Sequence, residues 1–105
     1  MSFDIRITRA AERDLMSAVD HIEHVLFDPA AADELLSETE RVVSALAEFP
    51  EMYALADDPV LKSWGVRIAP VKKYIAFYTI DEDERCVKII RFLYGKRDWN
   101  SILRQ

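Results

Sequence analysis

Cations and aromatic side chains crowd the stretch RFLYGKRDW, residues 91–99, where an apolar, strand-like run ends. Arg91 and Tyr94 belong to that run, and Lys96 and Arg97 follow it at once. Guanidinium and ammonium groups bind phosphate, and aromatic rings stack on nucleic-acid bases. The stretch therefore indicates an anionic partner, with single-stranded RNA as the first candidate.

Similar residues occur earlier in the chain, and together they suggest a ribonuclease that needs no metal. Such an enzyme requires a group that takes the 2′-hydroxyl proton and cations that bind the crowded phosphate. The candidate catalytic residues are Arg67, Arg91, Tyr94 and Arg97. The candidate RNA-binding residues are Lys72, Lys73, Lys96 and Trp99. We expect them to converge on one hollow, because strand ends meet in an antiparallel sheet. The alternative is a set of exposed, solubilising cations.

Other residue types give weaker signals. His21 and His24 lie three positions apart on a predicted helix, off its apolar side and without a third ligand, so solvent exposure is the better interpretation. Asp98 precedes a short helical segment, and a capping role fits it better than general-base catalysis. Cys86 has no partner for an internal disulfide and is predicted to pack. No metal site and no cofactor are expected.

Charge divides the chain into two parts. The formal net charge is −5. Residues 1–59 carry fourteen acidic and four basic side chains, a net −10, whereas residues 60–105 carry ten basic and five acidic ones, a net +5. Such asymmetry is typical of a protein with an anionic partner on its basic side, or of two solvated faces of opposite sign.

Length and composition limit the classes of function. A chain of 105 residues is the usual size for one hydrophobic core, so we expect a single domain over residues 1–105. No apolar run approaches the roughly 20 residues of a membrane helix. The charged start, MSFDIRITRAAERD, lacks the apolar stretch of a signal peptide. We therefore expect no membrane contact and a cytoplasmic location.

The elements that must position the candidate residues begin with a strand and two helices. Residues 3–8 alternate between apolar and polar types, which predicts a strand. Residues 9–27 have helical apolar spacing, with the preceding threonine as the predicted cap. Asp28 and Pro29 form a helix start signal, and Pro50 ends the second helix. Two amphipathic helices joined by a tight turn form an αα-hairpin.

The remainder of the chain predicts a sheet. Residues 51–65 have no clear period and should form the longest connection. Strands are predicted over residues 65–70, 74–80 and 85–94, and a short helix after Asp98. The fold class is α+β in the order β-α-α-β-β-β-α: an N-terminal strand, an αα-hairpin, a three-stranded antiparallel meander and a short C-terminal helix. The hairpin should cover one face of the sheet, with the C-terminal cations beside the opposite, partly open face.

The chain resembles the RelE/ParE superfamily of toxins, the toxin halves of type II toxin–antitoxin modules. The resemblance is carried by the N-terminal strand, the two helices, Arg67 in WGVRI, the segment KYIAFYTID and the segment IIRFLYGKRDW before a terminal helix. It extends over nearly the whole chain. It implies a small bacterial or archaeal intracellular toxin whose partner is a cognate antitoxin, partly disordered, that wraps the toxin and covers its active surface.

The superfamily divides by target, so the resemblance leaves three functions open. RelE-type members cut mRNA in the ribosomal A site without a metal, which would make this chain an endoribonuclease with the ribosome and mRNA as partners. ParE-type members poison DNA gyrase and are not nucleases. An inactive homologue would only bind its antitoxin. The RelE pattern carries over at Arg67, Lys96 and Arg97, and Tyr94 stands where many relatives have a histidine. We rank translation inhibition first because of the Gly-Lys-Arg turn and the tyrosine next to it.

Three features depart from the RelE pattern. Ile75 replaces the arginine that RelE has after the tyrosine of its central strand. Ser101, Ile102 and Leu103 occupy the region where RelE has a terminal-helix tyrosine. The chain is also net acidic, whereas ribosome-targeting members tend to be strongly basic, so its long-range attraction to a polyanion would be weaker. The activity therefore stays open among the three functions.

Overall fold

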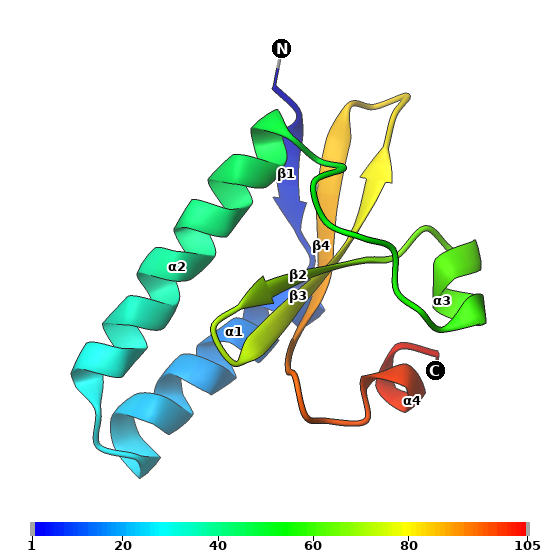
Figure 1. The fold of residues 1–105 in the computed structure, drawn as a ribbon. Coiled ribbons are helices and arrows are strands. Elements are labelled where there is room, and N and C mark those ends of the chain that lie inside the picture. The colour runs from blue at the N-terminus through cyan, green and yellow to red at the C-terminus, as the bar shows by residue number, and fades with distance from the viewer. Residues whose placement is uncertain (1, 105) are drawn as a thin grey trace.

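A four-stranded sheet organises residues 2–104, the part of the chain that the computed structural model describes (Figure 1). The strands are β1 (Asp4–Ile7), β2 (Arg67–Val71), β3 (Tyr74–Asp81) and β4 (Cys86–Tyr94). Their order across the sheet is β1-β4-β3-β2. The predicted antiparallel meander of β2, β3 and β4 is confirmed, and β1 adds to it as a strand parallel to β4.

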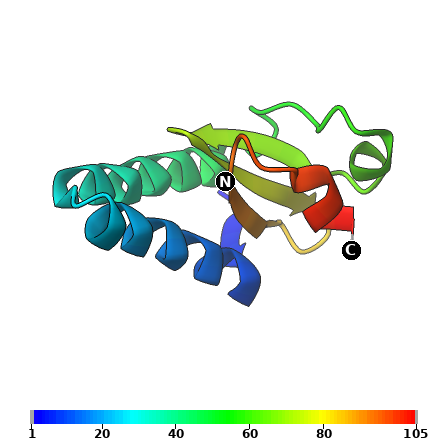
Figure 2. The same cartoon turned by 90° about the horizontal axis from the view of Figure 1, so that it is seen from below.

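Helices flank the sheet on both faces. They are α1 (Arg9–Asp20), the π-helical turn η1 (His21–Val25), α2 (Pro29–Glu48), α3 (Pro59–Ser63) and α4 (Trp99–Arg104). Figure 2 shows the hairpin of α1 and α2 on one side of the molecule and α3 and α4 on the other. Within residues 2–104, no helix combines the length and apolar character needed to cross a membrane.

Side-chain caps fix where the hairpin helices begin. The Thr8 hydroxyl accepts a hydrogen bond from the Ala11 N–H at 3.1 Å, at the start of α1. The Asp28 carboxylate accepts one from the Ala31 N–H at 3.1 Å, at the start of α2. Each bond satisfies a backbone donor that the first helical turn leaves without a partner. Both predicted helix starts are therefore confirmed, and Phe49 closes α2 just before Pro50.

The main core lies between the hairpin and the sheet. The hairpin contributes Ala11, Ala18, Leu35, Val42 and Leu46. The sheet contributes Ala69, Val71, Ala76, Tyr78, Val87, Ile89 and Phe92. Tyr78 is fully buried, and its hydroxyl donates a hydrogen bond to the Pro50 carbonyl at 2.7 Å. Cys86 is buried in β4, which confirms its predicted packing role.

Two short helices, α3 and α4, cover part of the opposite face of the sheet, which was expected to be partly open (Figure 2). Trp99 of α4 packs on Phe77 with their ring centroids 5.2 Å apart, and Leu61 of α3 belongs to the same apolar cluster. Residues 51–65 were expected to form a connection without a helix, but α3 lies within them. Asp58 caps α3 by accepting the Leu61 N–H at 3.0 Å. An aspartate before a proline is the same start signal as at α2, although five residues are too few to show helical spacing.

Candidate functional site

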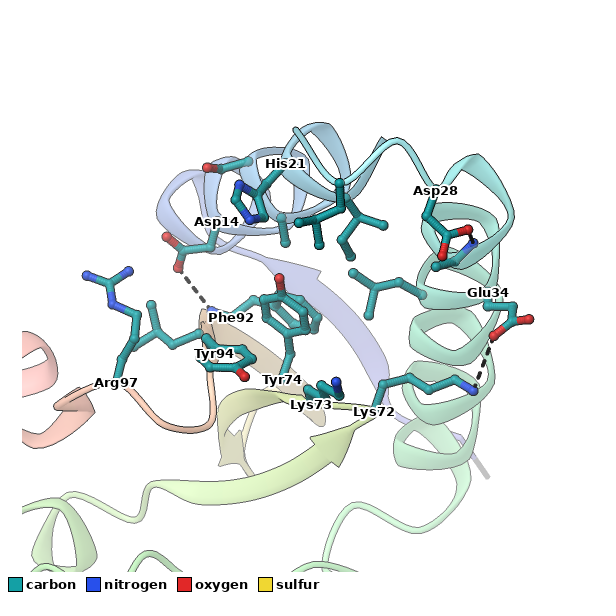
Figure 3. Close-up of a pocket in the computed structure, with 17 residues that line it drawn as sticks. Asp14, His21, Asp28, Glu34, Lys72, Lys73, Tyr74, Phe92, Tyr94 and Arg97 are labelled. Atoms are coloured by element: carbon teal, nitrogen blue, oxygen red, sulfur yellow. Dashed lines mark hydrogen bonds and ion pairs between the residues drawn. The ribbon is translucent and has the colours of Figure 1, made fainter. Parts of the chain in front are cut away.

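A pocket of about 860 Å³ lies between the helical hairpin and the sheet (Figure 3). Its apolar lining from the hairpin includes Ala18, Ile22, Leu26 and Leu35. From the sheet it includes Tyr74, Phe92, Leu93 and Tyr94, at the end of the sheet where β3 starts and β4 ends. The pocket therefore lies on the hairpin side of the sheet, and the expectation that the C-terminal cations flank the opposite face is wrong.

Aromatic rings form the sheet side of this pocket. Tyr74 and Tyr94 are opposite each other in the β3–β4 register. The Tyr74 ring stacks on Phe92 with centroids 5.3 Å apart and meets Tyr94 edge-on at 5.5 Å. Burial raises the pKa of the Tyr74 hydroxyl above its ordinary value, and neighbouring Tyr94 raises it further. Tyr74 is therefore poorly placed to take a proton at neutral pH.

Four of the predicted residues come together at the pocket: Lys72, Lys73, Tyr94 and Arg97 line it. The Lys72 ammonium lies 3.7 Å from the Glu34 carboxylate, and both side chains are exposed. No ion pair within residues 2–104 involves Lys73 or Arg97. Two cations at the pocket are thus available to an anionic group of a partner.

Gly95 brings Arg97 to the pocket. The Gly95 N–H donates a hydrogen bond to the Lys73 carbonyl at 2.9 Å, so the chain leaving β4 runs against the β2–β3 turn. A Cβ at Gly95 would lie 3.2 Å from that oxygen, closer than an ordinary contact. Glycine permits this close approach of two backbones, and Arg97, two residues further on, lines the same pocket as Lys73.

Arg91 is engaged elsewhere, because it binds Asp14 of α1. Its Nε and Nη2 donate to the two Asp14 carboxylate oxygens at 2.7 and 3.0 Å, and the Phe92 N–H donates to the same carboxylate at 3.0 Å. The Arg91 and Asp14 side chains are only 29% and 15% exposed. The bond to Asp14 raises the pKa of Arg91. The charge of Arg91 is therefore compensated within the fold.

Arg67 lies at the other end of β2 from the Lys72–Lys73 turn. Its Nη1 donates a hydrogen bond to the Tyr53 carbonyl at 2.7 Å, and it pairs with Tyr78 in the β2–β3 register. Neither Arg67 nor Arg91 lines the pocket. The expectation that Arg67, Arg91 and Arg97 share one hollow is therefore wrong.

The remaining candidates also lie outside the pocket. Lys96 is exposed in the turn after β4, and Trp99 is half-buried against Phe77 on the opposite face. Asp98 accepts hydrogen bonds from the Ser101 N–H at 3.5 Å and the Ser101 hydroxyl at 2.8 Å, which confirms its predicted capping role.

Several polar residues that line the pocket were not predicted as site residues, among them Asp14, His21 and Glu34. Asp14 lies on the same side of α1 as buried Ala11 and Ala18, and an acid at such a position needs a partner, which is the signal that could have identified it. His21 is solvent-exposed, as predicted, and it also lines the pocket (Figure 3). No group of His, Cys, Asp and Glu among the described residues could hold a metal ion.

This arrangement is better suited to binding than to bond cleavage. The pocket offers an apolar lining, two aromatic rings from tyrosine and two cations without an ion-pair partner. Phosphoryl-transfer catalysis needs cations placed around one phosphate and a proton acceptor next to them. Two of the three predicted arginines are committed to Asp14 and to a backbone carbonyl.

Comparisons with known proteins agree on one family of folds. Residues 5–99 match the family model described as the ParE toxin of type II toxin–antitoxin systems, parDE. The solved chromosomal ParDE toxin–antitoxin system from P. aeruginosa is similar, with a TM-score of 0.71 and 20% identity over 90% of this chain and 98% of that one. The RelBE2 toxin–antitoxin complex from Mycobacterium tuberculosis is similar as well, with a TM-score of 0.63 and 19% identity over 90% of this chain and 99% of that one. A comparison with curated protein sequences found no match.

Proposed function

Because this chain belongs to the ParE toxin family of type II toxin–antitoxin systems, we propose that it poisons DNA gyrase by binding it and does not cut nucleic acid. The proposal reverses the order in which the sequence ranked the two targets. It places the protein in the cytoplasm, where gyrase and DNA are. It also requires a cognate antitoxin that binds the toxin and prevents growth arrest.

The observation that carries the proposal is the position of the three arginines. Asp14 holds Arg91 through two hydrogen bonds, and the Tyr53 carbonyl holds Arg67, so only Arg97 of the three faces the pocket. A metal-free ribonuclease needs several cations around one phosphate. A toxin that acts by docking on a protein has no such requirement, because the affinity of a protein interface comes from buried apolar and aromatic groups.

The pocket suits a segment of the antitoxin. Its lining is largely apolar, and its acids are engaged: Asp14 binds Arg91, Glu34 lies beside Lys72 and Asp28 caps α2. Lys73 and Arg97 stay without an ion pair within residues 2–104, which fits an amphipathic peptide with acidic residues beside its apolar side. A disordered inhibitor that folds on binding buries a large surface, as the superfamily resemblance implies for this partner. Its binding would cover the pocket and leave other surfaces to the target.

Supercoiling by purified gyrase tests the proposal directly. We expect the purified chain to inhibit supercoiling and to increase the cleaved DNA that gyrase holds, at concentrations at which a translating extract keeps its mRNA intact. The Arg91→Ala and Arg67→Ala variants should inhibit as well as the wild-type chain, after correction for any unfolded fraction. Intact supercoiling together with cut mRNA would overturn the proposal.

One observation favours mRNA cleavage as a second candidate: Tyr94, Lys73 and Arg97 share the pocket. In that case Tyr94 would assist proton transfer and the two cations would bind phosphate. Tyr94→Phe and Arg97→Ala should then abolish ribosome-dependent cleavage of a reporter mRNA without loss of folding. If both variants arrest growth as the wild-type chain does, this candidate is excluded. If the wild-type chain arrests no growth at all, the protein is an inactive homologue that binds only its antitoxin.

A further inference from the structure

The turn between α1 and α2 exposes three apolar side chains in a row. Val25, Leu26 and Phe27 are 57%, 59% and 82% exposed. Figures 1 and 2 show this turn at the far end of the hairpin, remote from α3 and α4. We call residues 25–27 the hairpin tip. It adjoins the pocket, because Leu26 also lines it. Contiguous exposed apolar groups rimmed by charges are typical of a protein-interaction site.

Phe27 has an unfavourable backbone conformation and an exposed side chain. Its φ of 53° is in the left-handed region, which is unfavourable for a bulky residue. The Asp28 N–H donates to the Ile22 carbonyl at 3.0 Å, a helix-ending motif whose left-handed position usually holds glycine. The Phe27 ring is among the most exposed of the large apolar side chains, so packing does not offset the backbone conformation. A strained backbone conformation at an exposed apolar residue indicates a role in binding a partner.

The charges around the hairpin tip indicate what kind of partner fits. Asp20, Glu23 and Asp28 flank it, and His24 lies 3.7 Å from Asp20 and 3.8 Å from Glu23. The surrounding part of the chain is strongly acidic, with a net charge of −10 over residues 1–59. Nucleic acid would be repelled by these charges. A second copy would bring the same acidic rim against itself across a two-fold axis. The hairpin tip is complementary to a partner surface that has an apolar pocket bordered by Lys and Arg.

We propose that the hairpin tip is the surface with which this toxin docks on its protein target, with Phe27 as the anchor in an apolar pocket on a positively charged, DNA-binding face. This inference rests on the proposed function for the identity of that target, gyrase, whose surface must be basic where it holds DNA. The antitoxin pocket and the docking tip are then neighbouring surfaces: the pocket offers Lys73 and Arg97, and acids flank the tip. A bound antitoxin can obstruct the tip without occupying it.

Phe27→Asn is the decisive substitution, because Asn tolerates the left-handed conformation and removes the apolar anchor. Phe49→Asn is the matched control, since Phe49 is 66% exposed at the distant end of α2. We expect Phe27→Asn to raise the concentration of chain needed for half-inhibition of gyrase by about tenfold or more, the loss typical of an interface anchor. The control should stay within about twofold. Thermal unfolding verifies that both variants are folded.

A charge reversal tests the rim independently. Glu23→Lys places a cation beside the tip, and Glu40→Lys makes the same change on an exposed part of α2. Glu23→Lys should weaken gyrase inhibition several-fold at low salt and less at high salt, because screening reduces the repulsion. Glu40→Lys should have a smaller effect at both salt concentrations. Equal effects of the two reversals would show that only the net charge matters, and would overturn the assigned rim.

Growth arrest, measured beside gyrase inhibition, separates the two proposals. If Phe27→Asn loses both and Phe49→Asn keeps both, the docking tip is supported. If Phe27→Asn inhibits gyrase as the wild-type chain does, the tip is overturned and the gyrase proposal stands. If the wild-type chain arrests growth without inhibiting gyrase, and Phe27→Asn abolishes the arrest, the tip is supported and gyrase is excluded. A wild-type chain with neither effect overturns both.

Discussion

A single carboxylate, Asp14, determines what Arg91 can do. Its Oδ2 accepts hydrogen bonds from Arg91 Nε at 2.7 Å and from the Phe92 N–H at 3.0 Å, so one group joins α1 to β4 through a side chain and a backbone. Cations on a strand near a candidate site look the same in sequence whether they bind a ligand or an acid of the fold. Here 77 positions separate the pair, and no local pattern connects them.

Replacing Arg91 with alanine should destabilise the fold. The substitution leaves the mostly buried Asp14 carboxylate with only the Phe92 N–H, and we expect the free energy of unfolding to fall by about 2–3 kcal/mol. Arg97→Ala is the control, and it should change that free energy by less than about 0.5 kcal/mol because Arg97 is exposed. Urea denaturation measures both variants. Equal effects would contradict a structural role for Arg91.

Replacing Phe27, unlike replacing Arg91, should stabilise the fold. Asn or Gly at this position relieves the left-handed backbone and removes no buried contact, so Phe27→Asn should raise the free energy of unfolding by about 0.5–1 kcal/mol. The same urea titration measures the gain, with Phe49→Asn as the comparison. A destabilised Phe27→Asn variant would mean that the ring supports the hairpin after all. A variant that is more stable and less toxic would identify Phe27 as a functional residue.

At the scale of elements, the short helices α3 and α4 form a coupled unit. Asp58 caps α3 and also forms an ion pair with Arg104 of α4, with Arg104 Nε 3.2 Å from its Oδ2. The hydrogen bond from the Leu61 N–H, followed by the bond and charge of Arg104, lowers the pKa of Asp58. This carboxylate therefore stabilises the folded chain only while it is ionised.

The pH dependence of this unit follows from the direction of that shift. The folded chain binds a proton at Asp58 less readily than the unfolded chain does, so the stabilisation is complete above the ordinary carboxyl pKa, near 4. It is lost as the pH falls through the lower pKa of the folded state. Asp58→Asn should therefore reduce the stability difference between pH 6 and pH 3, as measured by urea unfolding at both pH values. An unchanged difference would contradict the role given to this group.

Local signals in the sequence predicted the larger elements well. Thr8, Asp28 and Asp98 act as the caps that their positions suggested, and the three meander strands lie within a few residues of the predicted ranges. The first helix is shorter than predicted, because its last turn winds as the π-helical η1. The helix α3 was missed since five residues carry no period. The parallel pairing of β1 with β4 was not predicted either, because nothing in an edge strand specifies its distant neighbour.

At the scale of the whole molecule, the division of charge has a different meaning from the one that sequence suggested. The basic second part does not form one anion-binding surface, because Arg67 and Arg91 are used inside the fold and Arg104 binds Asp58. At the pocket, the cations without an ion pair among the described residues are Lys73 and Arg97. The position of that pocket depends on how α1 and α2 lie over the ends of β3 and β4, which no stretch of sequence states on its own.

The acidic first part has a role of its own in this account. It surrounds the hairpin tip with negative charge. One face of the molecule therefore suits a target that has a basic surface, and another face suits an acidic segment of the antitoxin. Under the proposed function, separate partners for the two charged parts would let a net acidic chain act as a toxin without binding nucleic acid directly.

A time course after induction of the chain alone separates gyrase poisoning from mRNA cleavage. The same cells are assayed for DNA breaks, reporter-mRNA integrity and the rate of protein synthesis. Binding without nucleolytic chemistry predicts that broken DNA accumulates first, with mRNA intact and protein synthesis at the uninduced rate. Cut mRNA and falling protein synthesis before any DNA break would contradict it.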